Sequence, residues 1–148
     1  MSKVFFLAYA ENEFIISAEA SEKLIGDKEL KVGIKPVLKY KDDTEAIGCQ
    51  LRVVYELEDK QILTYSAIMT VVIDGWGRFL KGEPSDREKI NYSATAWIDV
   101  LGFARGVICS KAQSQGNNTV AQRMLPPVEM EKFLDAVSIE KVDQEKKE

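Results

Sequence analysis

The chain has 148 residues, of which 45% are hydrophobic and 30% charged, and its formal net charge is −4. A chain of this length supports one domain with a hydrophobic core of its own. The acidic balance argues against a nucleic-acid partner, because phosphate binding requires a clustered basic surface.

The N-terminal part of the chain has the pattern of a strand followed by a loop. Residues 3–20 contain two apolar bursts whose aromatic and β-branched content predicts one long strand, broken by a bulge or a bend. Residues 19–30 are polar apart from Leu24 and Ile25 and carry the turn signal Gly26-Asp27, which predicts a loop. The two apolar loop residues either cover a groove or pack back into the core.

Three further segments alternate between apolar and polar residues, which is the period of a half-buried strand. They are residues 31–41, 46–58 and 62–73. Pro36 removes a backbone donor from the first of them and indicates an edge position or a bulge. The last strand is partly apolar on both faces at its centre, as if each face were covered. These segments predict a meander of four antiparallel strands.

The segment after the last strand places aromatic residues among glycines. Trp76 and Phe79 follow Gly75 and Gly77, and they are either part of a binding surface or anchors for a loop. Ser85 and Glu88 have the spacing of a capping box, in which each residue satisfies a backbone donor of the other. A helical turn is therefore expected to begin there and to lead into the next element.

The next element is a long helix that is apolar on nearly two faces and ends near Gln115. One stripe consists of Trp97, Leu101, Ala104 and Ile108, and much of the rest of the circumference is filled by Ile98, Val100, Phe103 and Val107. An ordinary surface helix has a single apolar stripe. This helix is therefore expected to pack on the sheet on one side and on another subunit or partner on the other, unless it is the central helix of a monomeric core.

Gly102 and Gly106 support the first of these interpretations. Each glycine costs about 1 kcal/mol of helix propensity relative to alanine. A close approach of another helix, or of the sheet, would explain why the helix tolerates both. We therefore place the stripe of Trp97, Leu101, Ala104 and Ile108 at an oligomer interface.

After an extended connector at 119–124, the run Leu125-Pro126-Pro127-Val128 leads into a short helix that carries Phe133 and Leu134. Residues 139–148 are mainly charged and are expected to be a disordered tail. The predicted fold class is α+β: a four-stranded antiparallel sheet, then a long helix and a short C-terminal helix packed on one face. Residues 1–138 are expected to form a single domain.

The residue types needed for common catalytic chemistry are missing. The sequence contains no histidine, so it holds neither a Ser-His-Asp nor a Cys-His arrangement, and it has no glycine-rich phosphate loop. Cys49 and Cys109 lack metal-site spacing and are expected to be reduced, buried apolar residues, as in a cytoplasmic protein. We expect a binding protein that is not an enzyme and has no metal or cofactor.

The order of elements over residues 12–134 resembles the SecB-type protein-export chaperones. Four antiparallel strands, a glycine-bearing exit with aromatics at Gly75–Phe79, a long helix, a polar connector and the Leu125-Pro126-Pro127-Val128 run carry the resemblance. It implies a homotetramer, built as a dimer of dimers. It also implies an ATP-independent holdase that binds unfolded or slow-folding polypeptides in apolar grooves.

The resemblance also implies which residues would contact a client. The matching positions are Leu24, Ile25, Trp76, Phe79, Val120, Met124 and Leu125. Methionine and aromatic side chains suit broad apolar recognition because they adapt in shape.

The resemblance does not extend to the C-terminus. The best-known members of the family end in a zinc tail of cysteines and histidines that docks the SecA motor, and residues 139–148 contain neither residue type. Relatives that protect antitoxins lack that tail, so export and antitoxin protection both remain open. Two alternatives from another class are a small apolar ligand in a cleft between sheet and helix, and a single dedicated partner.

Overall fold

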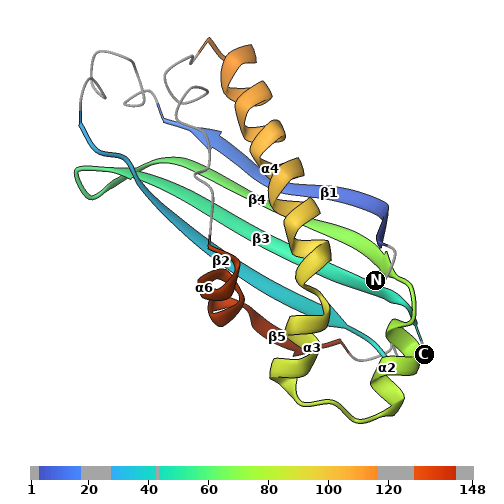
Figure 1. The fold of residues 1–148 in the computed structure, drawn as a ribbon. Helices are drawn as coiled ribbons and strands as arrows, with labels where there is room; N and C mark the ends of the chain where they lie inside the picture. Colours follow the sequence, from blue (N-terminus) through green and yellow to red (C-terminus); the bar gives the residue numbers. More distant parts are fainter. Residues whose placement is uncertain (1–3, 18–27, 43, 117–128, 143–148) are drawn as a thin grey trace, which may run out of the picture.

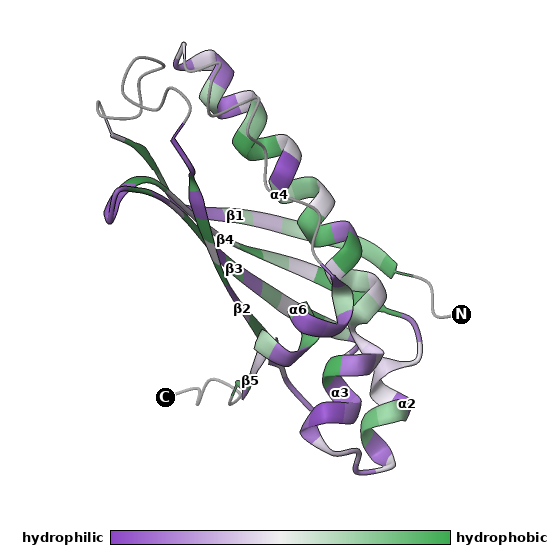
Figure 2. Cartoon of the chain, turned by 60° about the vertical axis from the view of Figure 1, so that its left-hand side comes forward, coloured by the Kyte–Doolittle hydropathy of each residue, from purple (hydrophilic) through white to green (hydrophobic). Residues whose placement is uncertain are grey.

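The fold was determined as a computed structural model, which describes residues 4–17, 28–42, 44–116 and 129–142 (Figure 1). It is a mixed α+β structure in which one sheet is covered on one side by helices (Figure 2). In chain order the elements are β1 (Val4–Ile16), β2 (Lys31–Tyr40), β3 (Ala46–Leu57), β4 (Lys60–Ile73), α2 (Trp76–Lys81), α3 (Asp86–Tyr92), α4 (Ala94–Ser114), α6 (Met130–Ala136) and β5 (Ser138–Lys141). In the described residues, no helix is both long and apolar enough to cross a membrane.

The strand order in the sheet is β1-β4-β3-β2-β5. Strands β2, β3 and β4 form the predicted antiparallel meander. The turn between β3 and β4 has positive φ at both Glu58 and Asp59, as the type I′ form of a two-residue hairpin turn requires. The prediction is wrong at the two edges. β1 pairs antiparallel with β4 and not with β2, and a fifth strand, β5, pairs parallel with β2.

Both differences have a physical reason. The fourteen residues between Ile16 and Lys31 are too many for the tight turn that would force β1 and β2 into a hairpin, so β1 is free to pair with β4. β5 follows α6 directly and places Ile139 opposite Leu38 on the helix-covered face. The charged tail predicted at 139–148 thus begins with strand residues.

The predicted break in β1 is confirmed as two register shifts, one between Phe6 and Ala8 and one between Glu11 and Glu13.

The capping box predicted at Ser85 and Glu88 is also confirmed. Ser85 N donates to Glu88 Oε1 at 3.0 Å, and Glu88 N donates to Ser85 Oγ at 3.2 Å. The backbone N–H of Ser85 is the main cause that holds the pKa of Glu88 below its ordinary value.

Helix α4 crosses the sheet diagonally (Figure 1) and buries one of its two apolar faces against it. Trp97, Leu101, Ala104 and Ile108 are all at most 3% exposed. The stripe predicted at an oligomer interface therefore lies in the core of the chain, because the sheet offers these side chains an apolar surface of their own. The other apolar face of α4, which carries Ile98 and Phe103, is exposed.

The segment after β4 forms a helix where the sequence indicated a loop. Gly75 has φ +85° and ends the extended chain, and α2 begins at Trp76, which is fully buried. The Trp76 ring lies near those of Tyr40, Phe79 and Tyr92. Of the two alternatives for this segment, the structure favours the anchor.

Candidate functional site

Five of the seven large apolar residues that are exposed in the described chain lie at the β1 edge of the sheet, beside α4. On β1 they are Phe5, Phe6, Leu7 and Tyr9, of which Leu7 is 65% exposed, and on α4 the neighbouring residue is Phe103, which is 42% exposed. We call these five residues the edge patch. Phe6 and Tyr9 lie with Phe103 on the helix-covered face of the sheet, whereas Phe5, which pairs with Val72, lies on the opposite face. Clustered exposed apolar side chains mark a binding site more often than scattered single residues do.

Ring contacts join three residues of the edge patch across the two elements. The Phe103 ring centroid is 5.6 Å from that of Phe6 and 5.1 Å from that of Tyr9. Beside these rings is an open groove of about 470 Å³, lined by Tyr9, Gly102, Phe103, Gly106, Val107, Ser110 and Lys111. The groove is largely apolar, because the rings of Tyr9 and Phe103 line it and Gly102 and Gly106 contribute no side chains.

A polar cluster borders the groove. Lys111 forms an ion pair with Glu11 at 2.7 Å, and its ammonium lies 5.1 Å from the centroid of the Phe14 ring. The Tyr9 and Tyr65 hydroxyls are 3.0 Å apart, and burial raises the pKa of both phenols. Both tyrosines therefore stay neutral near pH 7, and the charges at this border are those of Lys111 and Glu11.

Packing within the described chain does not explain why α4 has glycine at positions 102 and 106. A Cβ atom added at Gly102 or at Gly106 would meet nothing within 4 Å. Together with Ile98, which is 54% exposed, they form a stripe at helical spacing that we call the glycine face. The close approach that the sequence indicated would have to come from outside the described residues.

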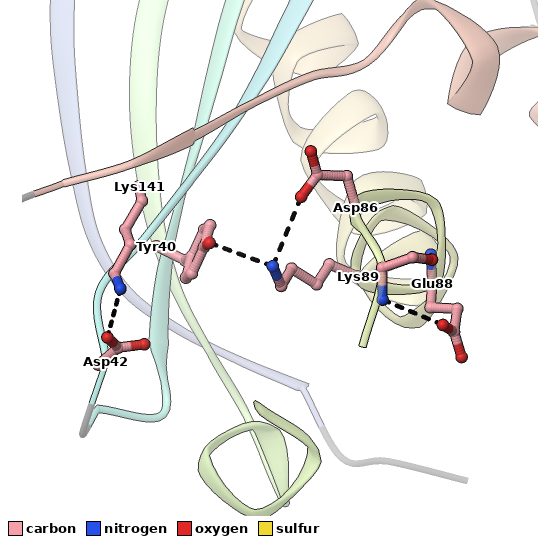
Figure 3. A network of polar contacts seen from close by, with 7 residues as sticks. Tyr40, Asp42, Asp86, Glu88, Lys89 and Lys141 are labelled. Carbon is pink, nitrogen blue, oxygen red and sulfur yellow. Dashed lines mark hydrogen bonds and ion pairs between the residues drawn. The ribbon is translucent and has the colours of Figure 1, made fainter. Parts of the chain in front are cut away.

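A second cavity, of about 900 Å³, lies near the turn between β2 and β3 and has a different character (Figure 3). Its lining includes the cations Arg78, Lys81, Lys89 and Lys141 and the carboxylates Asp42, Glu45 and Glu83. Lys89 donates to the Tyr40 hydroxyl at 3.2 Å and pairs with Asp86 at 3.5 Å. Lys141 pairs with Asp42. The first of these bonds links α3 to β2, and the last links β5 to the turn that follows β2.

Of the seven residues that the resemblance assigned to a client groove, the structure describes two, Trp76 and Phe79. Trp76 is buried and Phe79 stacks on Tyr92 with centroids 4.2 Å apart, so both anchor α2. Leu24, Ile25, Val120, Met124 and Leu125 lie outside the described residues, and their role stays a prediction. Both cysteines are free thiols: Cys49 is buried, as expected, and its burial raises the thiol pKa, whereas Cys109, which was expected to be buried as well, is only half-buried.

Sequence reasoning missed the edge patch. It interpreted the run Val4–Leu7 only as the start of a strand. The available signal was the adjacency of Phe5, Phe6 and Leu7, because neighbouring strand residues point to opposite faces. Three large apolar residues in a row therefore predict a strand with an apolar residue on each face, and a surface strand of that kind needs a partner.

No protein-family model matches the sequence, and a comparison with curated proteins gives no significant match. Among solved structures, the chain is similar to a SecB-like chaperone from Mycobacterium tuberculosis in complex with a peptide from an antitoxin. The two chains are 10% identical, the alignment covers 84% of this chain and 83% of the other, and the TM-score is 0.49.

Proposed function

We propose that this protein is an ATP-independent holdase, which binds unfolded polypeptides at exposed apolar surface and releases them for export or for the protection of an antitoxin. The observation that carries the proposal is the edge patch. Five large apolar side chains are exposed at one edge of the sheet, and three of them, Phe6, Tyr9 and Phe103, are joined by ring contacts. An unfolded chain offers similar apolar side chains, which the patch would bind in preference to a folded surface.

The energetics suit broad recognition. Fully burying one large apolar side chain contributes about 1.5–3 kcal/mol, so several patch residues engaged together would hold a client without a sequence motif. Aromatic rings supply much of this contact area while losing little conformational freedom. The patch thus favours polypeptides with apolar segments over a ligand of defined shape.

The proposal includes assembly into a homo-oligomer, with a tetramer as the expected form. The glycine face supports it, because the helix tolerates two glycines whose Cβ positions are open to a close-packed neighbour. Because Gly102 and Gly106 also line the groove beside Phe103, assembly through the glycine face would fill that groove and leave the β1 side chains of the edge patch to the client. One particle would then carry several patches, and a client bound at two of them is held far longer than at one.

The alternative of a small ligand between sheet and helix has less support. That interface is filled by the buried side chains of α4, including Trp97 and Leu101. A dedicated protein partner could use the same edge patch, however, and the experiment below separates it from a general client.

The test is the aggregation of a chemically denatured protein diluted into buffer without ATP, with and without this protein at near-stoichiometric amounts. We expect suppression, because a holdase binds the unfolded state and not the native one. The double variant Leu7→Ser/Phe103→Ser should lose most of it, while Val54→Ser, which changes a half-buried residue on β3 away from the patch, should keep it.

Two results would count against the proposal. Absence of suppression with several unrelated clients would contradict a general holdase and favour a single dedicated partner. Equal suppression by the wild type and by Leu7→Ser/Phe103→Ser would remove the edge patch as the binding surface. Circular dichroism of each variant shows whether the fold is retained.

A further inference from the structure

We propose that a pocket on the helix-free face of the sheet binds a small amphipathic monocarboxylate, such as a medium-chain fatty acid, with its carboxylate beside Lys39 and Lys41. The site is separate from the edge patch and would serve a function beyond the proposed holdase activity. The pocket has a volume of about 370 Å³, and we call it the outer pocket. Its lining includes Lys39, Lys41, Gly48, Ile68, Thr70 and Val142.

The outer pocket lies on the face of the sheet that no described helix covers (Figure 2). Met69 is fully buried on the helix-covered face. Because successive strand residues point to opposite faces, its neighbours Ile68 and Thr70 lie on the open one. Gly48 pairs with Thr70 on one side and with Lys39 on the other. Lys39, Gly48 and Thr70 therefore form one cross-strand row on the open face.

Gly48 leaves the floor of the outer pocket without a side chain. A Cβ atom added there would lie 3.2 Å from Ile68 Cδ1 and 3.4 Å from Lys39 Cβ, so even alanine would occupy the space between these two side chains. Glycine inside a strand often marks a place where a ligand approaches the backbone closely. Ile68 from β4 and Val142 after β5 add apolar surface to the lining. The outer pocket can thus contact an apolar chain.

Among the described residues, the charged side chains that line the outer pocket are all basic. They are Lys39 and Lys41, which lie two positions apart at the end of β2. Neither lysine forms an ion pair with another described residue. Glu140 faces Lys39 in the pairing of β2 with β5 but does not line the pocket. Two cations without a neutralising partner attract a ligand with a negative charge.

Size and charge together define the class of ligand. The volume of about 370 Å³ lies near the lower end of the range of about 300–1,000 Å³ that is typical of small-molecule sites. The larger cavity near the turn between β2 and β3 differs in charge, since carboxylates accompany the cations of its lining. An apolar floor beside two lysines fits a molecule with one anionic head and one apolar chain. That chain would also cover Ile68, which belongs to the second apolar face of β4.

The first experiment compares sodium octanoate with 1-octanol, which has the same chain length but no charge. Each is titrated into the full-length, ¹⁵N-labelled protein, and the amide chemical shifts are followed by NMR. We expect octanoate to shift the signals of Gly48, Ile68 and Thr70 and to bind at least fivefold more tightly than octanol. Equal affinities would overturn recognition of the anionic head. Shifts confined to the edge patch would show an adventitious apolar contact only and overturn the site.

The second experiment changes the charges of the protein. Lys39→Gln/Lys41→Gln removes the two cations of the outer pocket, and the matched control Lys31→Gln/Lys35→Gln removes two cations of the same strand that do not line it. We expect the first variant to bind octanoate at least fivefold more weakly than the wild type, and the control to stay within twofold. An equal loss in both variants would indicate non-specific attraction and overturn the site.

The third experiment fills the floor of the outer pocket. We expect Gly48→Ala to bind octanoate at least threefold more weakly than Gly33→Ala, whose added Cβ atom would meet nothing within 4 Å. Equal binding by two variants with wild-type circular dichroism would overturn the assignment of the floor. If Gly48→Ala does not fold, the charge variants decide the proposal, because they leave the packing of the sheet unchanged.

Other occupants of the outer pocket would give different results. If Lys39→Gln/Lys41→Gln dissociates an oligomer, measured by light scattering, a second copy of the chain covers the pocket and the small ligand is wrong. If the wild type does not bind octanoate and the same variant no longer suppresses aggregation, the pocket holds a client polypeptide, and the small ligand is again wrong. Octanoate binding that requires both lysines, in a protein that suppresses no aggregation, would support the site and count against the holdase alone.

Discussion

Trp97 and Ile98 are neighbours in the chain but face opposite sides of α4. Trp97 is fully buried and its ring packs edge-on against Phe133 of α6 at 5.4 Å, whereas Ile98 is 54% exposed. We expect Trp97→Ala to lower the free energy of unfolding by about 3–5 kcal/mol. Ile98→Ala should change it by less than about 0.5 kcal/mol in the dissociated chain.

Urea unfolding at several protein concentrations measures both effects. Because Trp97 is a core residue of one chain, the loss caused by Trp97→Ala should not depend on protein concentration. If the loss in the free energy of unfolding disappeared on dilution, Trp97 would instead lie at an oligomer interface, as predicted from the sequence.

The sequence could show that both faces of this helix are apolar but not which face meets the sheet. Core and interface demand the same side-chain chemistry, so periodicity alone does not separate them. Trp76 illustrates the same difficulty: an aromatic residue beside glycines is as suitable for a loop anchor as for a binding surface, and only its burial decides. The capping box, in contrast, is predictable because both of its hydrogen bonds form within one turn.

The two glycines of the glycine face lower the stability of α4 and, as we propose, allow a close contact between copies of the chain. Because added Cβ atoms would meet nothing at Gly102 or Gly106, we expect Gly102→Ala and Gly106→Ala each to stabilise the isolated chain by up to about 1 kcal/mol. The same variants should weaken self-association. Gly33→Ala on β2 is a control, since its Cβ position is equally open.

Thermal unfolding measures the first effect and light scattering the second. A gain in stability without a change in oligomer size would contradict the role of the glycine face in assembly.

At the scale of helices and strands, the sequence predicts elements well where periodicity is local, as in β2 to β4 and α4. It misses β5, because the four residues of that strand gain their structure from pairing with β2 and not from their own pattern.

For the molecule as a whole, exposed apolar surface links stability to association. Association that covers the glycine face stabilises the folded state by mass action. We expect the thermal midpoint of the wild type to rise with protein concentration, and that of Gly102→Ala/Gly106→Ala to rise less. Differential scanning calorimetry over a hundredfold range of concentration measures this, and a midpoint that stays constant would indicate a monomer.

The position of β1 has a consequence for the synthesis of the chain. β1 leaves the ribosome before the other strands of the sheet, and its partner β4 ends only at Ile73. At a translation rate of about 5–20 residues per second, roughly 3–11 s pass between Ile16 and Ile73. Throughout that interval the nascent chain presents Phe5, Phe6 and Leu7 without their sheet. The N-terminal segment of each newly made copy is therefore an unfolded apolar segment, of the kind that folded copies of the same protein are proposed to bind.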